Sequence, residues 1–402
     1  MSFYIRDAVN DKARKVVRRA SYKITDFWGA GYPGENFLIT GGQKNERIWG
    51  LNYAVLDYLR RKQRPVVVLH SSAELDAVLY NETRREDSSI TYTAFGNGRK
   101  NYQPFVGMDV PKVVEAIKGQ CKLNAMLNET DLAAYATCFL TVLAQFEKEP
   151  SLHNIFKLSR ETNEQIVRRA RYAGQPQNII SGIEAHAGTG EQFAGIIKSL
   201  VESLKNSMYS PIVNAGQSIC SCFQKNGNRQ VISLNIGAYN TSAAIRCLAD
   251  ELAVLSGQEF LLVIYDVDVD GKNGLKELLT NRRASYSIGL CSEEIRGMFE
   301  NIGQDGYNTV RARMTKKVIF SYTDAEVAKS INNIAGEYEK TTKVKQKAPH
   351  MPWNPMPPAA DTKAKVMMPK IEASEICEMK EGAAMLYGHA KDTIYFVRRL
   401  YY

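Results

Sequence analysis

The run Asn36-Phe37-Leu38-Ile39-Thr40, followed directly by Gly41-Gly42, decides the fold. Its apolar residues predict a short buried strand, and the glycine pair predicts a turn. The residues from Arg47 to Arg61 have helical periodicity, and Pro65–His70 is a second apolar run of strand length. A strand, a turn, a helix and another strand in this order are typical of a parallel α/β sheet.

The α/β alternation is interrupted once by a long stretch without strand patterns, from about 109 to 210. Four helical patterns fill it, at Ala116–Ala125, Asp131–Phe146, Asn163–Tyr172 and Glu191–Met208. Further strands are expected before it at Ile90–Phe95 and after it at Gln230–Leu234, Phe260–Asp266, Ser287–Leu290 and Val318–Tyr322. The sequence therefore predicts an all-α domain inserted into an α/β domain.

Two basic segments lie outside this alternation. In residues 1–35, Val9, Ala13, Val16, Val17 and Ala20 recur at helical spacing between arginines and lysines, which predicts an amphipathic basic helix. Residues 340–370 hold seven lysines, six prolines and a single acid, Asp361, which predicts an exposed, extended linker. We therefore expect six segments, namely 1–35, 36–108, 109–210 (the all-α insert), 211–339, the linker 340–370, and 371–402, a closing strand pair.

The composition limits the class of protein. The 402 residues carry a net charge of +9, which favours anionic partners such as nucleic acid but also fits ordinary solubility charge. Cys220 and Cys222 are the only closely spaced cysteines, so no zinc site is expected. The longest uncharged apolar stretch, Leu132–Phe146, is too short to span a bilayer. The odd number of cysteines, seven, and the lack of a signal-peptide pattern predict a protein of the reducing cytoplasm.

The turn after the first strand can be compared with a P-loop, G-x-x-x-x-G-K-[ST], whose backbone N–H groups, lysine and hydroxyl bind Mg·nucleotide. The first glycine is present as Gly41 and is followed by Gly42. The second glycine is replaced by Glu46, the lysine by Arg47 and the hydroxyl residue by Ile48. A carboxylate repels phosphate and isoleucine cannot hold Mg²⁺, so tight binding of Mg·ATP is not expected. Lys44 and Arg47 remain candidate phosphate ligands, although solvated surface positions are the favoured interpretation.

The second element of a P-loop motor is a buried strand that ends in an Asp-Glu pair. Here the strand ends in Asp266-Val267-Asp268, so the metal-linked acid has a counterpart in Asp266 but the catalytic glutamate is replaced by Val267. Asp268 and Asp270 suggest a cation site only weakly, because the spacing of a calcium loop is incomplete. We expect a solvated acidic loop.

The order of these elements resembles the TraG/TraD-type coupling proteins of conjugation and type IV secretion, which are relatives of the FtsK/HerA DNA translocases. Tyr102–Phe105 resembles the segment that leads into their all-α domain, Asn281–Leu290 their arginine-bearing helix end and sensor strand, and Glu381–Tyr402 their last strands. The resemblance implies a RecA-like P-loop sheet flanked by helices. It also implies that Arg282 or Arg283 descends from an arginine finger at a subunit boundary.

This chain departs from the family at the residues that handle nucleotide. Cys291-Ser292 stands where the family has its sensor glutamine, and no paired transmembrane helices occur at the N-terminus. We therefore expect a catalytically inactive homologue that needs no cofactor. It would act as a scaffold or adaptor with other secretion or conjugation subunits, as a homo- or hetero-oligomer, and would reach a membrane only through partners. Two alternatives remain: a diverged, active DNA-translocating ATPase that uses ATP and Mg²⁺, or a non-catalytic module that binds nucleic acid through the basic segments.

Overall fold

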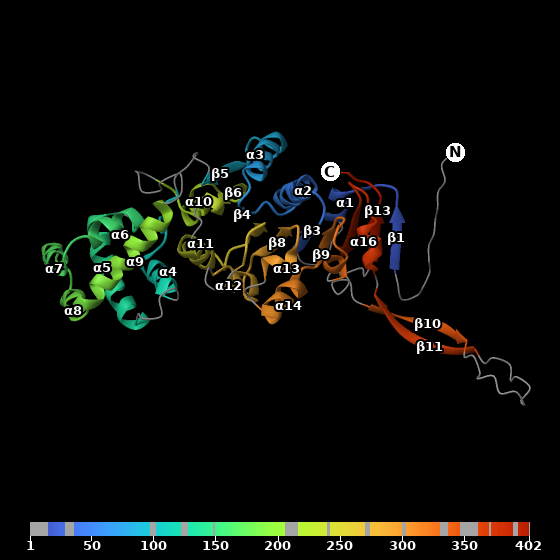
Figure 1. Cartoon of the computed structure of the whole chain (residues 1–402). Coiled ribbons are helices and arrows are strands. Elements are labelled where there is room, and N and C mark those ends of the chain that lie inside the picture. Colours follow the sequence, from blue (N-terminus) through green and yellow to red (C-terminus); the bar gives the residue numbers. More distant parts are fainter. Residues whose placement is uncertain are drawn as a thin grey trace, which may run out of the picture.

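The computed structural model describes residues 15–28, 36–96, 102–121, 128–147, 149–205, 216–238, 242–269, 274–299, 303–329, 337–345, 361–369, 371–388 and 393–401. Within these residues the molecule is elongated (Figure 1). An all-α domain forms one end, the α/β domain lies in the middle, and a separate two-stranded hairpin projects from the other end.

The α/β domain is built on one ten-stranded sheet. In spatial order its strands are β1 (Lys15–Arg19), β13 (Thr393–Val397), β12 (Ala384–Gly388), β9 (Lys316–Ile319), β3 (Phe37–Thr40), β8 (Ser287–Ser292), β7 (Leu261–Tyr265), β4 (Val66–His70), β6 (Gln230–Asn235) and β5 (Thr91–Phe95). The strands from β9 to β5 are parallel. β12 is antiparallel to both β9 and β13, so the predicted closing pair is confirmed.

The central strands are buried on both faces. Along β7, for example, Leu262 and Ile264 belong to one apolar cluster, whereas Leu261 and Val263 belong to another. Successive side chains of a strand point to opposite faces, so an uninterrupted apolar run is what a parallel sheet covered on both sides requires.

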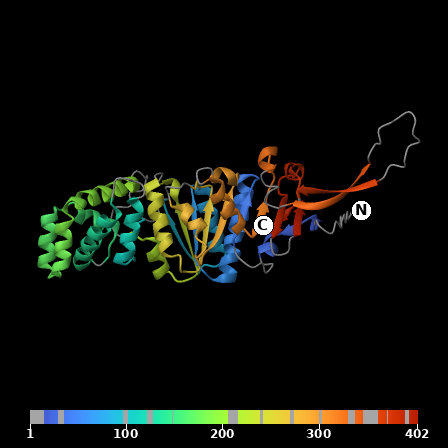
Figure 2. The same cartoon turned by 90° about the horizontal axis from the view of Figure 1, so that it is seen from below.

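Helices cover the two faces of the sheet (Figure 2). One face is covered by α1 (Ile24–Trp28), α2 (Lys44–Lys62) and α3 (Ala73–Glu86), with Ser72 as the N-cap of α3. The other face is covered by α10 (Ile219–Lys225), α11 (Ser242–Val254), α12 (Leu275–Thr280), α13 (Ile295–Met298) and α14 (Gly303–Arg313). The predicted RecA-like α/β sheet flanked by helices is therefore confirmed.

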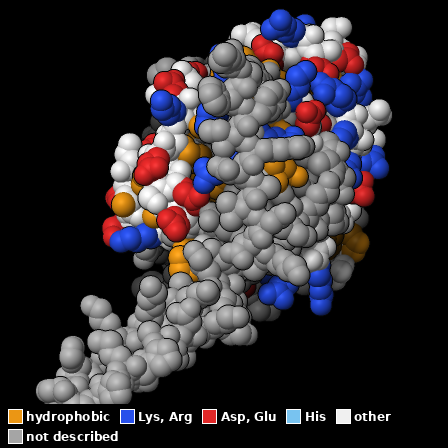
Figure 3. All heavy atoms as spheres, turned by 90° about the vertical axis from the view of Figure 1, so that its right-hand side faces the viewer, with side chains coloured by type: hydrophobic (Ala, Val, Ile, Leu, Met, Phe, Trp, Pro, Cys, Tyr) orange, Lys and Arg blue, Asp and Glu red, His pale blue; other side chains and the backbone are white. Residues whose placement is uncertain are grey.

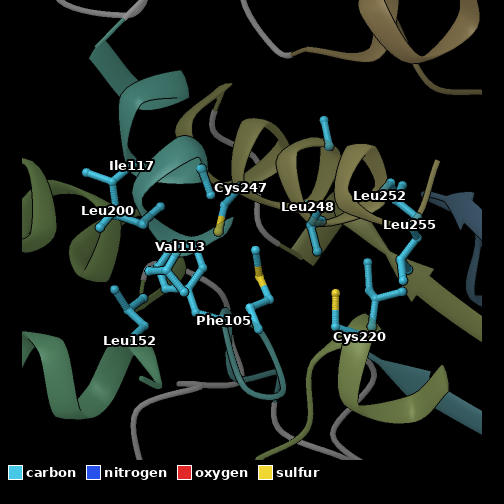
Figure 4. Close-up of a cluster of buried hydrophobic side chains, with 14 of the residues drawn as sticks. Phe105, Val113, Ile117, Leu152, Leu200, Cys220, Cys247, Leu248, Leu252 and Leu255 are labelled. Carbon is cyan, nitrogen blue, oxygen red and sulfur yellow. The ribbon is translucent and has the colours of Figure 1, made fainter. Parts of the chain in front are cut away.

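The predicted helical stretch between β5 and β6 forms a helical domain. Its helices are α4 (Val110–Cys121), α5 (Glu129–Phe146), α6 (Leu152–Ser159), α7 (Asn163–Tyr172), α8 (Gln177–Ala185) and α9 (Ala187–Lys205). Its core is continuous with that of the sheet. In Figure 4, Val113 of α4, Leu152 of α6 and Leu200 of α9 lie around the same cluster as Cys247 and Leu252 of α11.

The predicted N-terminal helix is wrong over the described residues. Residues 15–19 form the edge strand β1, and Tyr22–Lys23 form β2, which pairs with β14 (Leu400–Tyr401). Helical spacing was a misleading signal because the C-terminal strand β13, nearly 380 residues further along the chain, supplies a pairing partner that a local window cannot include. The β-branched valines of this segment also favour a strand. Residues 1–14 lie outside the described part.

The predicted linker at 340–370 is also corrected over its described residues. β10 (Glu337–Lys345) and β11 (Asp361–Pro369) pair in antiparallel register from Glu337–Pro369 to Lys345–Asp361. The two strands form a sheet of their own that projects from the body (Figures 1 and 2). The lysines had indicated solvation, but Thr, Val and Met between them permit strand pairing. Most of the prolines fall in residues 346–360, which are not described.

Candidate phosphate-loop site

The candidate site lies at the carboxyl ends of β3, β8 and β7, where ligands bind in open α/β sheets. Three residues, Gly41–Gln43, join β3 to α2, because α2 already begins at Lys44. Gly41 and Gly42 have φ of 77° and 67°. The connection is therefore shorter than the P-loop template, and Glu46, Arg47 and Ile48 lie inside the first turns of the helix.

The backbone donors of this loop are bonded to protein acceptors. The N–H of Gly41 donates to the carbonyl of Glu293 at 3.2 Å, and that of Gly42 donates to the carbonyl of Ser321 at 2.7 Å. The N–H of Gln43 donates to the Glu46 carboxylate at 2.7 Å. A P-loop binds phosphate with its backbone N–H groups, and here the first three are engaged within the chain.

The two glycines are required by close packing. The segment after β9, which was predicted as strand through Tyr322, leaves the ladder after Ile319 and passes over the loop. A Cβ on Gly41 would come within 2.7 Å of the Tyr322 ring and 2.8 Å of the Phe320 carbonyl, and one on Gly42 within 2.5 Å of Phe320 Cβ. Glycine has no Cβ and accepts positive φ, so both requirements are met by this residue type alone.

Glu46 joins the loop to the C-terminal part of the chain. One carboxylate oxygen accepts the Gln43 N–H, and the other accepts the N–H of Gly382 at 2.7 Å. The residue is only 8% exposed. Its carboxylate thus lies at the N-terminus of α2, where negative charge is favourable, and where a P-loop would place the phosphates.

Arg47 is buried, at 4% exposure, which corrects the favoured interpretation that it is a solvated surface residue. Its guanidinium donates to the carbonyls of Gly42 at 2.7 Å and Gly41 at 3.3 Å. It also lies 3.4 Å from the Glu293 carboxylate and 3.9 Å from that of Asp266. The long side chain turns back from the first turn of α2 onto the loop, so its charge is compensated within the protein.

Ile48 and Lys44, the remaining residues compared with the P-loop template, have a packing role and a surface role. Ile48 is 1% exposed and packs in the apolar cluster beneath α2. Lys44 is half-exposed and forms an ion pair with Glu74 at 2.7 Å. Of the two basic residues considered as phosphate ligands, only Lys44 presents its side chain to solvent.

The acidic residues that follow β7 lie in different environments. Asp266 follows the strand with φ of 46°, and its N–H donates to the Cys291 carbonyl of β8 at 2.9 Å. Its carboxylate faces Arg47. Val267 is buried, and Asp268 is exposed on the loop that follows. The structure therefore brings Asp266 to Arg47, whereas Asp268 is exposed on the following loop and Asp270 lies outside the described residues.

Sequence reasoning missed the hydroxyl groups at the end of β3. The hydroxyls of Thr40 and Tyr322 contact each other, and both lie within hydrogen-bonding distance of the Glu293 carbonyl, at 3.1 and 2.7 Å. Burial raises the pKa of Tyr322, so the phenol stays protonated. The sequence predicted Tyr322 at the end of a strand, which is the only signal that placed it near β3. Nothing in the neighbouring residues indicates that the chain turns over the loop after β3 at this point.

A buried histidine–serine pair on β4 and β6 was also missed. His70 Nε2 lies 2.7 Å from the Ser233 hydroxyl, and His70 Nδ1 accepts the N–H of Ser72 at 3.1 Å. With Nδ1 as acceptor, Nε2 carries the proton and donates to Ser233. Burial lowers the pKa of His70 to about 4, so the ring is neutral. A donor at this position cannot act as the general base for the serine, and we assign the pair to the core.

Arg282 and Arg283 lie apart from this site, exposed in the turn between α12 and β8. Among the described residues, no group of three or more His, Cys, Asp and Glu side chains is arranged to hold a metal ion. Nor does any helix in that part of the chain have the length and apolar character needed to cross a membrane.

Comparison with known proteins gives matches in structure only. No family model matches the sequence, and no curated protein sequence matches it. The bacterial conjugative coupling protein TrwB (TrwBdeltaN70, trigonal form with sulphate) superposes with a TM-score of 0.57 at 12% identity, over 97% of this chain and 92% of that one. The chain has the fold of the conjugative coupling protein TrwB.

Two further solved structures agree with this fold. VirB4 of Thermoanaerobacter pseudethanolicus matches with a TM-score of 0.52 at 12% identity, over 92% of this chain and 90% of VirB4. A TrwB complex with the GTP analogue GDPNP matches with a TM-score of 0.54 at 12% identity, over 90% and 85% of the two chains. At such identities the likeness describes the fold, and the chemistry must be argued from the residues present.

Proposed function

We propose that this chain is a subunit of a conjugative DNA-transfer or type IV secretion apparatus that does not hydrolyse ATP. It acts there as a scaffold or adaptor. The assignment to such an apparatus is supported by the likeness to TrwB and VirB4, which covers more than nine-tenths of this chain in both cases. The absence of hydrolysis is argued from the loop that follows β3.

The observation that carries the proposal is the internal bonding of the loop. A nucleotide phosphate would have to displace the carbonyls of Glu293 and Ser321 from the N–H groups of Gly41 and Gly42. It would also meet the Glu46 carboxylate at the N-terminus of α2. Displacement leaves buried carbonyls without donors, at about 1–3 kcal/mol for each group. Binding therefore starts with a penalty that a P-loop does not have.

The positions of the cation and the catalytic carboxylate support the same proposal. Arg47 donates to the loop carbonyls and faces Asp266, so the acid that would be linked to Mg²⁺ already lies beside a positive charge. Val267 is buried where a glutamate would polarise the attacking water. The alternative of an active ATPase must rely on Lys44, whose nearest acid is Glu74.

A nucleotide-binding experiment tests the proposal. The purified chain is heated with and without millimolar ATP and Mg²⁺, and phosphate release is measured in parallel. A ligand present at a hundredfold excess over its Kd stabilises the folded state by about 2.7 kcal/mol, so we expect no shift in Tm and no turnover. Mg-dependent turnover that is lost in Lys44→Ala and kept in a Lys62→Ala control would establish the active alternative.

The adaptor role needs a separate experiment, because a chain without hydrolysis could still have another task. We propose that the exposed Arg282 and Arg283 contact a neighbouring subunit. A tagged chain is purified from its native cell with and without the Arg282→Glu/Arg283→Glu change, after cross-linking. We expect apparatus subunits to co-purify with the natural chain and to be lost from the variant, and equal recovery would remove the arginines from the interface.

Nucleic-acid binding is a second candidate, favoured by the lysine positions of the hairpin. Lys340, Lys343 and Lys345 of β10 pair in register with residues of β11 that include Lys363. Affinity that depends on phosphate contacts falls steeply with salt, with a slope of about −0.9 per contact. A binding titration with duplex DNA at several salt concentrations tests this candidate, and a flat dependence or no binding at low salt would exclude it.

A further inference from the structure

β1 and β13, which are far apart in the sequence, lie side by side at one edge of the ten-stranded sheet. β1 is the last strand of that sheet, and among the described residues it pairs only with β13, in parallel register from Lys15–Thr393 to Arg19–Val397. A strand at the edge presents unpaired N–H and C=O groups on its outer side. Val17, in the middle of β1, is 38% exposed. Among the described residues, no strand pairs with the outer side of β1.

Two arginines of β1 lie on opposite faces of the sheet. The Arg18 guanidinium lies 5.4 Å from the ring centre of Phe396, and that of Arg19 lies 5.2 Å from the ring centre of Tyr395. Because consecutive residues of a strand point to opposite faces, these contacts place one cation on each face.

Each arginine is held in place differently. Arg19 also lies 4.9 Å from the ring of Tyr22, which is stacked against Tyr395, so two aromatic rings orient its guanidinium. Arg18 forms an ion pair with Glu375 at 2.9 Å, with 59% of its own side chain exposed. The Glu375 side chain is 17% exposed and also accepts the N–H of Glu372 at 3.0 Å, so a carboxylate of a partner would reach the exposed part of the Arg18 guanidinium beside it.

Further cations surround this edge. Arg398 donates its N–H to the Arg19 carbonyl at 3.1 Å, and Arg399 accepts the N–H of Tyr22 at 3.3 Å. Their side chains, like that of Lys23, are exposed. Figure 3, which shows this end of the molecule, has Lys and Arg side chains gathered at its upper right. Among the described residues, the exposed cations on or beside β1 are thus Arg18, Arg19, Lys23, Arg398 and Arg399.

We infer that the free edge of β1 binds an extended acidic segment of a partner protein, which adds to the sheet as a further strand. Main-chain hydrogen bonds to β1 supply affinity, and alternate side chains supply specificity. Two consecutive acidic residues of the partner would lie on opposite faces, one beside Arg18 and one beside Arg19. The inference does not rest on how the chain handles nucleotide.

The placement of the arginines favours a strand over a nucleic acid. A duplex lying on one face of the sheet would reach Arg18 or Arg19, but not both. A strand that continues the sheet presents side chains to both faces at once. Charge also protects edge strands against aggregation, but that role needs neither two stacked aromatic rings around Arg19 nor cations on both faces.

A peptide titration tests the inference with the full chain. The probe is a fluorescein-labelled nine-residue peptide, Thr-Val-Thr-Val-Glu-Glu-Val-Thr-Val, followed by fluorescence anisotropy. A second probe has the two glutamates replaced by lysines, and a third keeps the charge but carries N-methyl groups on alternate residues, which block strand pairing. Hydrogen exchange is measured on the amides of residues 15–19 with and without the first probe.

We expect saturable binding of the first probe alone, together with added protection of the β1 amides. Arg18→Glu/Arg19→Glu should raise the Kd about tenfold or more, because like charges then face the probe. Arg84→Glu/Arg85→Glu, on exposed arginines of α3, makes the same charge change elsewhere and should leave the Kd unaltered. Absence of binding, equal binding of the N-methylated probe, or a duplex DNA that binds at Arg18 and Arg19 while the peptide does not, would overturn the inference.

Discussion

The Glu46 carboxylate accepts the backbone N–H of Gly382 at 2.7 Å, across 336 residues of sequence. The contact connects the first turn of α2 to the segment that precedes β12, so the C-terminal strands close over the loop after β3. In a P-loop this position holds glycine. The replacement therefore removes a phosphate-binding feature and at the same time adds a tertiary contact, which explains how the fold tolerates it.

This contact predicts the effect of removing the Glu46 carboxylate. Glu46→Ala leaves the N–H groups of Gln43 and Gly382 without their acceptor, and the residue is buried. Loss of a buried partner costs about 1–3 kcal/mol, so we expect a loss of about 2 kcal/mol in the free energy of unfolding, measured by urea denaturation. Glu74→Ala, at a half-exposed ion pair, should change it by less than about 0.5 kcal/mol. Equal effects of the two changes would contradict the prediction.

A second prediction concerns Gly41. Its Cβ in Gly41→Ala would meet the Tyr322 ring and two backbone carbonyls at under 3.0 Å, at a φ of 77°. We expect a loss of about 1–3 kcal/mol in a chain that has bound no nucleotide. Gly195→Ala is the matched control, because it lies exposed in α9 with no atom within 4 Å of the new Cβ. There alanine should stabilise by about 0.5–1 kcal/mol. A neutral Gly41→Ala would show that packing does not require this glycine.

The hydrophobic pattern of the sequence was sufficient to predict the central strands of the sheet. The apolar runs at Phe37–Thr40 and Leu261–Tyr265 are buried on both sides, so burial and local pattern agree and the strands can be predicted from sequence. Four helices of the insert were predicted with boundaries shifted by a few residues, whereas the short helices α6 and α8 were missed. The prediction held where the spacing of apolar residues matches the faces that the element buries.

The wrong predictions at the N-terminus and at the linker share a cause, which is strand pairing with other parts of the chain. β1 depends on β13, and β10 depends on β11 across an intervening segment. At the site, the substitutions Glu46 and Arg47 were visible in the sequence, but their partners Gly382 and Glu293 were not. A template comparison could show which groups are missing, whereas only the fold shows what has taken over their contacts.

A third prediction concerns pH and the buried Glu251 of α11. Its two carboxylate oxygens accept the N–H groups of Phe105 at 2.8 Å and Ile219 at 3.1 Å, at the two connections to the helical domain. Burial raises the pKa of Glu251 to about 8 despite these bonds. A raised pKa means that the folded chain holds a proton that the unfolded chain has lost. The stability contribution is therefore full below pH 4.5 and is lost as pH rises through 8.

The window from pH 6.5 to 8 isolates this titration. His70, whose pKa burial lowers to about 4, affects stability between 4 and 6.5. Lys317, whose pKa burial lowers to about 8, affects it above 8. We expect the free energy of unfolding to fall by about 1–2 kcal/mol from pH 6.5 to 8. Glu251→Gln should flatten this slope, and His70→Gln should leave it in place. Identical slopes in the natural chain and Glu251→Gln would contradict the assignment.

The last prediction separates the side chains of the loop from its backbone. Glu46→Gly/Arg47→Lys/Ile48→Thr restores every P-loop residue of the template except the length of the loop, because α2 still begins at Lys44. The N–H groups of Gly41 and Gly42 also keep their acceptors on Glu293 and Ser321. We therefore expect no Mg·ATP binding by isothermal titration and no turnover.

Stability must be measured beside binding, because the same triple change removes the contacts of Glu46 and Arg47. A folded but less stable variant without nucleotide binding is the expected result, and circular dichroism at the assay temperature establishes that it is folded. Glu46→Gln/Arg47→Met, which alters the same two positions without restoring the template, is the control for destabilisation alone. If the triple variant binds Mg·ATP and the control does not, three side chains rather than the closed backbone keep nucleotide out, and the loop after β3 must then open at little cost.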